Sequence, residues 1–426
     1  MPPTNPQSVL EPILNKRRAK TARKAAATTS HSKPHAKIAT KRHVPGTHTM
    51  RETLSQPAMW AETFAQLDSA KTIDRLAGHF SAQEPWLFVA CGSSYYLSQL
   101  LCDIWSRDFA FRCTAVPASE FLFAPEATLR SSGAKQVVFI SRSGETTEVI
   151  RAAELLKNRV AVRTLGVTCN AASRLDELCT DMATLPWADE KSTVMTRSFT
   201  SILLFLQLLG DRISERIGSG NAQCSQALKE LPALAQPWLN ANADRIRKFI
   251  AKKKFADFVF LGQGAHYWLA QEAALKITEM SASYAQAYHT LEFRHGPRSI
   301  AGPQTLITFF LSDAANEEEA LLVRELKALK AATLVVVNHA TPALKASSDL
   351  LIELNLTVPE FARIAVTAIP AHLLGTAVGL RKGLDPDSPK NLTRAVVLEE
   401  PVLGEPQKNS HAAPQLHGSR KLGANR

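Results

Sequence analysis

The sequence predicts an α/β protein made of two doubly wound parallel-sheet domains in tandem. Short, continuously apolar runs alternate with helical patterns, and this alternation occurs twice along the chain. Strands buried on both faces of a parallel sheet have such runs, and crossover helices connect them. The expected strands are residues 86–90, 136–141 and 164–168 in the first half, and 258–261, 305–311 and 333–337 in the second.

The length of 426 residues accommodates two domains of ordinary size. We expect them over residues 50–225 and 240–400, joined near a helical stretch at 231–251. Residues 1–45 are rich in Ala, Thr, Pro and basic residues, so they cannot bury enough apolar surface to offset the entropy of ordering. They are expected to be a disordered basic tail, and residues 405–426 a second loose tail.

Three interpretations of the N-terminal tail remain open. It is an inert tail, a nucleic-acid-binding arm, or a leader upstream of a start at Met50, where a helix is expected to begin. Its composition also fits an organellar transit peptide.

The net charge of +11 comes from the two tails. Residues 1–45 hold ten Lys or Arg against one acid, and residues 405–426 hold four against one, which leaves the centre of the chain at −1. The basicity therefore says nothing about what the folded part binds, and nucleic acid is expected to bind, if at all, through the basic tail.

Composition also bounds the cellular setting. No uninterrupted apolar stretch reaches the roughly 18–20 residues of a membrane helix, and the longest lies near 201–210. The six cysteines form no CxxC pair and no Cys/His cluster at metal spacing, so we expect reduced thiols, no metal site and a cytoplasmic location. No Walker loop or GxGxxG motif is present, which disfavours nucleotides.

Three loops of the first half are rich in Ser and Thr where an expected strand or loop runs into a helix. They are residues 91–94, 141–147 and 192–198. Hydroxyl donors together with free N–H groups at a helix N-terminus suit a phosphate monoester, and Gly144 lets the backbone approach the anion. The alternative is that these residues only cap helices.

An acid–base segment lies in the second half. On a helix, Glu272, Lys276 and Glu279 stand at i, i+4 and i+7 and share one stripe between apolar residues. Facing a cleft, Glu279 could move a proton between adjacent sugar carbons beside the Lys276 ammonium; facing solvent, the stripe is an ordinary salt bridge. His295 precedes Gly296-Pro297 on an expected turn, and its ordinary pKa suits ring opening, although a loop histidine can be incidental.

Together these segments resemble the sugar isomerase (SIS) family. Residues 50–400 are similar to the isomerase half of glucosamine-6-phosphate synthase and to the galactosamine-6-phosphate deaminase/isomerase (tagatose-6-phosphate ketose/aldose isomerase) group. The resemblance implies two flavodoxin-like SIS domains and no cofactor. It also implies a homodimer, because the family's ring-opening histidine reaches the site from the neighbouring subunit.

The resemblance further implies residue roles. Glu279 matches the glutamate that moves the proton, Lys276 and Glu272 are its polar neighbours, and His295 is the ring-opening histidine. The residues expected to line the sugar-phosphate site are Ser93, Ser94, Ser141, Arg142, Ser143 and Thr146, with Thr193 and Val194 making backbone contacts.

Two departures bear on the reaction. The chain has no glutaminase domain or N-terminal cysteine nucleophile, and Arg394 stands where the synthase has its Schiff-base lysine. Arginine stays protonated and cannot form that imine. Residues 141–144, 195–200 and 293–297 also look closer to the deaminase/isomerase group.

The sequence therefore favours a deaminase/isomerase acting on an amino- or keto-hexose 6-phosphate, in which Lys276 and Arg394 steady developing negative charge. One alternative is the synthase isomerase half supplied with ammonia from elsewhere. The other is a catalytically silent sugar-phosphate sensor.

Overall fold

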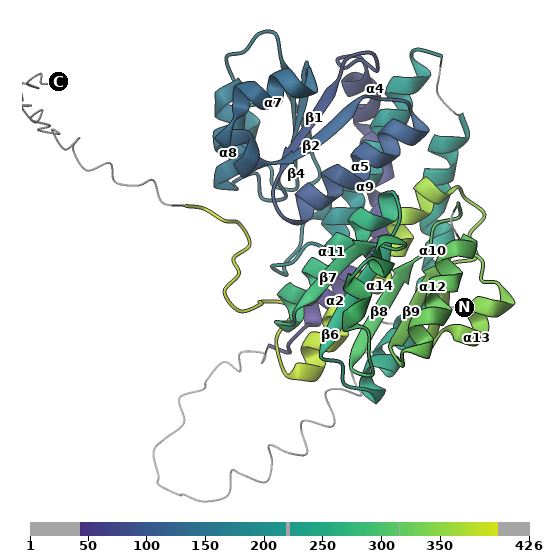
Figure 1. Ribbon diagram of the computed structural model, residues 1–426. Coiled ribbons are helices and arrows are strands. Elements are labelled where there is room, and N and C mark those ends of the chain that lie inside the picture. Colours follow the sequence, from purple (N-terminus) through teal and green to yellow (C-terminus); the bar gives the residue numbers. More distant parts are fainter. Residues whose placement is uncertain (1–42, 219–221, 315, 399–426) are drawn as a thin grey trace, which may run out of the picture. The chain divides into compact units, whose positions relative to one another are not determined.

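The computed structural model describes residues 43–218, 222–314 and 316–398. Residues 1–42 and 405–426, which make up nearly all of the two expected tails, lie outside the described residues. Of the described residues, those up to Val396 form one compact unit, shown in Figure 1.

Two five-stranded parallel sheets confirm the predicted fold class. The first sheet has the strand order β2-β1-β3-β4-β5 and the second has the equivalent order β7-β6-β8-β9-β10. The strands of the first sheet are β1 (Trp86–Ala90), β2 (Cys113–Pro117), β3 (Gln136–Ile140), β4 (Arg163–Thr168) and β5 (Asp181–Thr184). Those of the second are β6 (Asp257–Gly262), β7 (Ala285–His289), β8 (Thr305–Phe310), β9 (Ala332–Val337) and β10 (Leu350–Glu353).

The six strands expected from apolar runs are the six inner strands. The sequence reading missed β2, β5, β7 and β10, which are the four outer strands of the two sheets. An outer strand is covered less completely than an inner one. In β5 and β10 every second residue is partly exposed, β2 has one buried residue, and β7 has none. Without a continuous apolar run, these strands lack the signal on which the prediction depended.

Helices cover the sheets and connect the strands (Figure 1). In the first half they are α2 (Thr47–Leu54), α3 (Gln56–Ser69), α4 (Thr72–Ala77), α5 (Ser93–Asp108), α6 (Ala118–Phe123), α7 (Pro125–Ser132), α8 (Thr147–Leu156) and α9 (Arg197–Glu215). The later ones are α10 (Ala222–Lys252), α11 (Ala265–Ser281), α12 (Asn316–Ala328), α13 (Pro342–Ser347) and α14 (Glu360–Lys382). Short 3₁₀ turns are η2 (Arg174–Glu177), η3 (Pro186–Ala188), η4 (Glu292–Arg294) and η5 (Pro297–Ile300).

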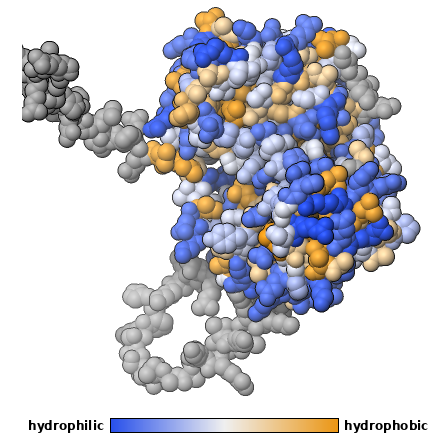
Figure 2. Space-filling view, viewed as in Figure 1, coloured by the Kyte–Doolittle hydropathy of each residue, from blue (hydrophilic) through white to orange (hydrophobic). Residues whose placement is uncertain are grey.

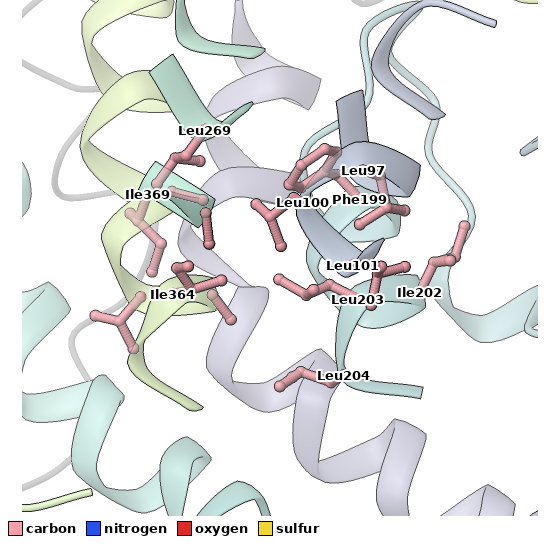
Figure 3. Close-up of a cluster of buried hydrophobic side chains, with 14 of the residues drawn as sticks. Leu97, Leu100, Leu101, Phe199, Ile202, Leu203, Leu204, Leu269, Ile364 and Ile369 are labelled. Carbon is pink, nitrogen blue, oxygen red and sulfur yellow. The ribbon is translucent and has the colours of Figure 1, made fainter. Parts of the chain in front are cut away.

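One hydrophobic cluster is continuous between the two sheet domains. Figure 3 shows its centre, where side chains of α5 and α9 from the first half face side chains of α11 and α14 from the second. The labelled residues there are Leu97, Leu100, Leu101, Phe199, Ile202, Leu203, Leu204, Leu269, Ile364 and Ile369. Burial of this surface stabilises the pairing of the two domains by the hydrophobic effect, and it brings α5 and α11 side by side.

Helix α14 is long and apolar enough to cross a membrane by length and composition, but 94% of its most apolar window is buried inside the protein. It therefore packs as a core helix. On the face drawn in Figure 2, apolar residues form small groups scattered among hydrophilic ones.

Helix α2 begins at Thr47, three residues before the Met50 start that the sequence suggested. The reason lies far away in the sequence, because Asp387 accepts hydrogen bonds from His48 N (3.0 Å), Thr49 N (2.7 Å) and Thr49 Oγ1 (2.8 Å). Asp385 accepts another from Gly46 N at 2.9 Å. These carboxylates satisfy the free N–H groups of the helix N-terminus, so residues 46–49 belong to the folded unit.

Candidate active site

A cavity of about 210 Å³ lies at the carboxyl ends of β1 and β3. This is where ligands bind in open parallel sheets. Its wall includes ten of the thirteen residues that the sequence singled out. They are Ser93, Ser94, Ser141, Arg142, Ser143, Thr146, Thr193, Val194, Glu279 and Arg394. Lys276 and Glu272 lie directly behind this wall, and His295 lies elsewhere.

The loop after β3 gathers hydroxyl groups at the N-terminus of α8. Ser141 Oγ lies 3.4 Å from Ser143 Oγ and 3.2 Å from Thr146 Oγ1. Gly144 adopts a φ of +67°, and a Cβ there would lie 2.3 Å from Ser173 Oγ. Only glycine fits this position without a shift of its neighbours, so the turn that groups the three hydroxyls depends on it.

Helix capping accounts for these hydroxyls only in part. Ser141 Oγ and Ser143 Oγ accept from Gly144 N (3.1 Å) and Glu145 N (3.2 Å) in the turn before α8, and their own protons remain available to donate. The N-cap positions of α5, α8 and α9 are Gly92, Thr146 and Thr196, and none of them makes a side-chain capping hydrogen bond. The hydroxyl of Thr146 points to Ser141 instead. The hydroxyls of this loop and the start of α8 are thus arranged around the cavity, as an anion site requires.

The third Ser/Thr-rich loop is held by two buried carboxylates. Glu190 accepts from Thr196 N (2.5 Å), Thr196 Oγ1 (2.7 Å) and the Ser198 hydroxyl. Glu52 on α2 accepts from Lys191 N (2.5 Å) and Ser192 N (3.2 Å). The sequence reasoning did not identify either residue as part of the site, and the Glu52 contact spans about 140 positions, so no local pattern reports it.

Within that loop, Thr193 already uses both backbone groups. Its N–H donates to the Asp387 carbonyl at 2.9 Å, and its carbonyl accepts from Arg142 Nη2 at 2.8 Å. A ligand can therefore meet the loop's backbone at Thr193 only as a second partner of its carbonyl oxygen.

Helix α11 brings the acid–base stripe from the second domain to the cavity of the first. Lys276 Nζ lies 2.5 Å from Glu279 Oε2, 3.0 Å from Ser93 Oγ and 3.3 Å from Glu272 Oε1. The side chains of Lys276 and Glu272 are fully buried, whereas Glu279 is 19% exposed. The stripe is therefore not a solvated salt bridge, and Glu279 is its member that reaches the cavity.

Burial and charge set the protonation of this cluster. Burial alone lowers the pKa of Lys276, but the adjacent carboxylates of Glu272 and Glu279 outweigh it and raise that pKa. Lys276 therefore stays an ammonium at neutral pH. Burial, opposed by Lys276 and helped by Glu279, raises the pKa of Glu272 to about 7, so Glu272 can hold a proton near neutrality.

Residues 392–396, called the C-terminal strap below, close one side of the cavity. The strap is fixed by Arg142 Nη2, which donates to the Arg394 carbonyl at 2.9 Å, and by Thr147 N, which donates to the Val396 carbonyl at 3.1 Å. The Arg394 guanidinium donates to the Glu190 carbonyl and the Asp189 carboxylate. Sequence reasoning singled out Arg394 alone from this segment.

His295 ends the 3₁₀ turn η4 and is exposed. Phe293, which is fully buried, anchors this turn to the second domain, and Gly296 follows with a φ of +124°. His295 is absent from the cavity wall of its own chain.

A protein-family model described as the SIS domain matches residues 81–211 and 250–374. The chain belongs to the SIS domain family. A glutamine–fructose-6-phosphate aminotransferase (isomerizing) of Pyrobaculum aerophilum is 29% identical over 367 residues, which are 85% of this chain and 59% of that protein. The Chlamydia pneumoniae protein of that name is 31% identical and covers 73% of this chain and 51% of its own length. The chain thus spans between half and three fifths of these relatives.

Solved SIS structures agree with the fold. A glucosamine-6-phosphate deaminase from Thermotoga maritima has a TM-score of 0.67 at 29% identity, and covers 82% of this chain and 99% of its own. The C-terminal domain of glucosamine-fructose-6-phosphate aminotransferase from Francisella tularensis has a TM-score of 0.69 at 24% identity, with 83% and 100% covered. The resemblance to the isomerase half of such enzymes is confirmed as homology.

Cys91 is the one cysteine on the wall of this SIS cavity. Burial, with a smaller contribution from Glu148, raises the pKa of its thiol to about 11. A thiol with this pKa is almost wholly protonated at neutral pH, so it is a poor nucleophile. The six cysteines are all unpaired.

The sequence suggested no cluster of metal ligands, but the structure brings His43, His48 and Asp387 within 4.8 Å of one another. The prediction missed this group because its members come from the two ends of the chain. Both carboxylate oxygens of Asp387 already accept hydrogen bonds from α2, so helix capping accounts for the arrangement.

Proposed function

We propose that this chain is a sugar-phosphate deaminase/isomerase that moves a proton between adjacent carbons of an amino- or keto-hexose 6-phosphate. The observation that carries the proposal is the pairing of two features in one cavity. A glutamate held by a buried lysine stands on the same wall as a hydroxyl-rich loop at a helix N-terminus. The first suits proton transfer and the second suits a phosphate.

The phosphate binds at Ser141, Ser143 and Thr146 in this proposal. Their hydroxyls supply the donors and the start of α8 adds the favourable end of its dipole. The N–H groups of Gly144, Glu145 and Thr147 already donate within the protein. Ser93 and Ser94 lie at the start of α5 on the same wall and face the sugar. Ser93 Oγ also accepts a hydrogen bond from the Lys276 ammonium, so Ser93 links the sugar to the acid–base cluster.

Glu279 takes a proton from the carbon next to the carbonyl group and returns it to the carbonyl carbon. An enediolate, or for an amino sugar the corresponding enolate, forms between these steps, and the Lys276 ammonium stabilises its negative charge. For an amino sugar, one proton moves from carbon 2 to carbon 1 and a second passes from the amine nitrogen to oxygen 1, which leaves an imine at carbon 2 and a hydroxyl at carbon 1. Water then hydrolyses that imine to a ketone and ammonia.

His295 opens the sugar ring in this scheme, and it comes from a second copy, because it is exposed and does not line the cavity of its own chain. A homodimer that exchanges this histidine would complete both sites. The turn suits that role, because Phe293 fixes it while leaving His295 outside.

Arg394 favours deamination or isomerisation over amination. Its guanidinium holds the strap to Asp189 and Glu190, and arginine cannot form an imine with a sugar. The sequence suggested that Arg394 steadies substrate charge. Its contacts support a role in the cavity wall, from which its charge still acts at short range.

One experiment tests the proposal directly. The purified protein is incubated with glucosamine 6-phosphate, galactosamine 6-phosphate, fructose 6-phosphate and tagatose 6-phosphate, while ammonia and ketose are followed. Release of ammonia with a ketose phosphate supports deamination, and ketose or aldose exchange without ammonia supports isomerisation. Formation of an amino sugar from fructose 6-phosphate and ammonium would favour the aminotransferase activity named for the relatives. Binding without any turnover would favour a sensor.

A further inference from the structure

The guanidinium of Arg142 occupies an unusual place in the cavity wall. Its backbone stands between Ser141 and Ser143, in the loop assigned to the phosphate. The side chain is only 5% exposed and pairs with the fully buried Glu190, with Nη1 at 3.4 Å from Oε2. Its Nη2 donates to two carbonyls at once, those of Thr193 (2.8 Å) and Arg394 (2.9 Å).

These contacts form a closed ring. Arg142 donates to the Arg394 carbonyl, Arg394 donates to the Glu190 carbonyl, and the Glu190 carboxylate pairs with Arg142. Three separate segments therefore meet at one guanidinium: the phosphate loop, the loop at 190–198 and the C-terminal strap. Arg142 therefore joins the loop at 141–147 to both other walls.

We propose that Arg142 is a positioning residue that couples binding of the phosphate to closure of the C-terminal strap. The inference rests on the proposed function, since it takes the loop around Arg142 to be the phosphate site. Arg142 acts through the Thr193 and Arg394 carbonyls, and it holds the strap closed when the loop is ordered around its anion.

The chemistry of the ring requires arginine. Its planar fork presents several N–H donors in fixed directions, whereas a lysine ammonium is a compact point charge. A lysine at 142 can keep a positive charge near Glu190 but cannot span Glu190 and both carbonyls together. Glu190 also accepts from Thr196 and Ser198, so its carboxylate keeps hydrogen-bond donors in such a variant, and the domain should still fold.

Limited trypsin cleavage of the full-length protein provides the test. Arg394 lies in the strap and is exposed to solvent, so the rate at which trypsin cleaves the peptide bond after Arg394 reports opening of the strap. The variants are Arg142→Lys and, as a matched control, Arg151→Lys, which changes an exposed arginine on α8. Fragments are identified by mass, the ligand is fructose 6-phosphate, and its binding is measured by calorimetry.

In the unmodified protein and in Arg151→Lys, fructose 6-phosphate should slow cleavage after Arg394 about 10-fold or more. In Arg142→Lys, cleavage without ligand should be about 10-fold faster, as expected from losing a hydrogen bond or two that hold the strap. The ligand should then bind about 10-fold more weakly and protect the strap little. Equal ligand-free cleavage and equal protection in Arg142→Lys and Arg151→Lys would overturn the proposal.

The outcomes separate this proposal from the proposed function. Fructose 6-phosphate that binds the unmodified protein without slowing cleavage would refute the coupling and leave the phosphate site intact. Failure of all four hexose phosphates to bind would refute the function, and the ligand-free cleavage rates would still decide whether Arg142 anchors the strap. If Arg142→Lys does not fold, hydrogen exchange of amides 392–396 in the unmodified protein, with and without ligand, measures the same coupling.

Discussion

The carboxyl ends of the two sheets carry equivalent loops with different contents. Gly92, before α5, has φ and ψ of 55° and −130°, and Gly264, before α11, has 54° and −132°. Ser141 N donates to the β4 carbonyl of Val167, and Leu311 N donates in the same way to the β9 carbonyl of Val336. By this register, the hydroxyl of Ser141 is replaced in the second domain by an apolar leucine.

The next positions extend the contrast. Ser312 and Asp313 stand where the first domain has Arg142 and Ser143. Glu319, which is buried, accepts from Ser312 N at 3.0 Å and Ser312 Oγ at 3.3 Å. Only about 10 Å³ of cavity remains nearby, lined in part by Glu360 and Arg363. The crevice of the second domain is thus nearly closed, whereas the equivalent edge of the first sheet has a cavity of about 210 Å³.

The helices that face the two crevices differ in the same sense. Glu279 is the fifteenth residue of α11, and the fifteenth residue of α5 is Arg107. Arg107 Nη2 lies 3.9 Å from Glu360 Oε1 in the second crevice. The positions that match Lys276 and Glu272 are Ile104 and Leu100, which belong to the core. The same fold therefore carries a buried Glu–Lys–Glu cluster beside one crevice and apolar residues at the positions matching Lys276 and Glu272 beside the other.

The largest effect should come from Glu279→Gln. The amide keeps the shape of the side chain but cannot accept the proton, so kcat should fall about 10²–10⁴-fold while the Kd of the sugar phosphate changes little. The matched control is Glu319→Gln, in the other crevice, which should keep kcat. Retention of more than about a tenth of the rate by Glu279→Gln would remove Glu279 from the role of base.

A second effect should separate the two hydroxyl loops. Ser143→Ala removes one donor to a charged acceptor, worth about 1.5–3 kcal/mol, so KM for the phosphorylated sugar should rise about 10-fold or more. Ser312→Ala in the second domain should leave KM unchanged, because its crevice takes no ligand. If KM rises with Ser312→Ala but not with Ser143→Ala, the phosphate binds in the second domain and the assignment to the first is wrong. Good turnover of an unphosphorylated hexose would refute the anion site itself.

A third effect concerns the N-terminal residues, which contact Asp385 and Asp387 near the first crevice. Removing residues 1–42 should leave Tm and KM unchanged. Removing residues 1–49 also takes away the donors of Asp385 and Asp387, and the Asp387 carbonyl in turn holds Thr193. Loss of such capping costs about 1 kcal/mol, so Tm should fall by about 1–2 °C and KM should rise about 3-fold. Identical behaviour of the two truncations would show that residues 43–49 do not support the site.

The sequence predicted what local patterns carry. The inner strands appeared as apolar runs, the hydroxyl loops as Ser and Thr beside helix starts, and the Glu272–Glu279 stripe as a helical spacing. It could not predict that Lys276 would reach Ser93 across 183 positions, or that Glu52 would hold the loop at 191–192, because such contacts depend on how the two domains pack. The Arg142 ring was equally invisible, since its three segments are distant in the sequence.

The smallest effect should appear in the pH dependence of stability. Burial raises the pKa of Glu319 to about 7, above the ordinary 4.5, although Thr290 and Ser312 oppose it. Because the folded state binds this proton more tightly than the unfolded state, the contribution of Glu319 to stability is fully present below about pH 4.5 and is lost as the pH rises through about 7. Glu319→Gln removes that dependence.

Relative to the unmodified protein, Glu319→Gln should therefore gain on the order of 1 kcal/mol between pH 4.5 and pH 8. Denaturant unfolding at several pH values measures this gain, and Glu318→Gln, which changes an exposed carboxylate one residue earlier, serves as control. Glu272, whose pKa is also raised to about 7, titrates in both proteins and cancels in the difference. If the difference between Glu319→Gln and the unmodified protein does not change with pH, Glu319 is not a buried carboxyl that replaces an anion, and the account of why the second crevice is closed fails.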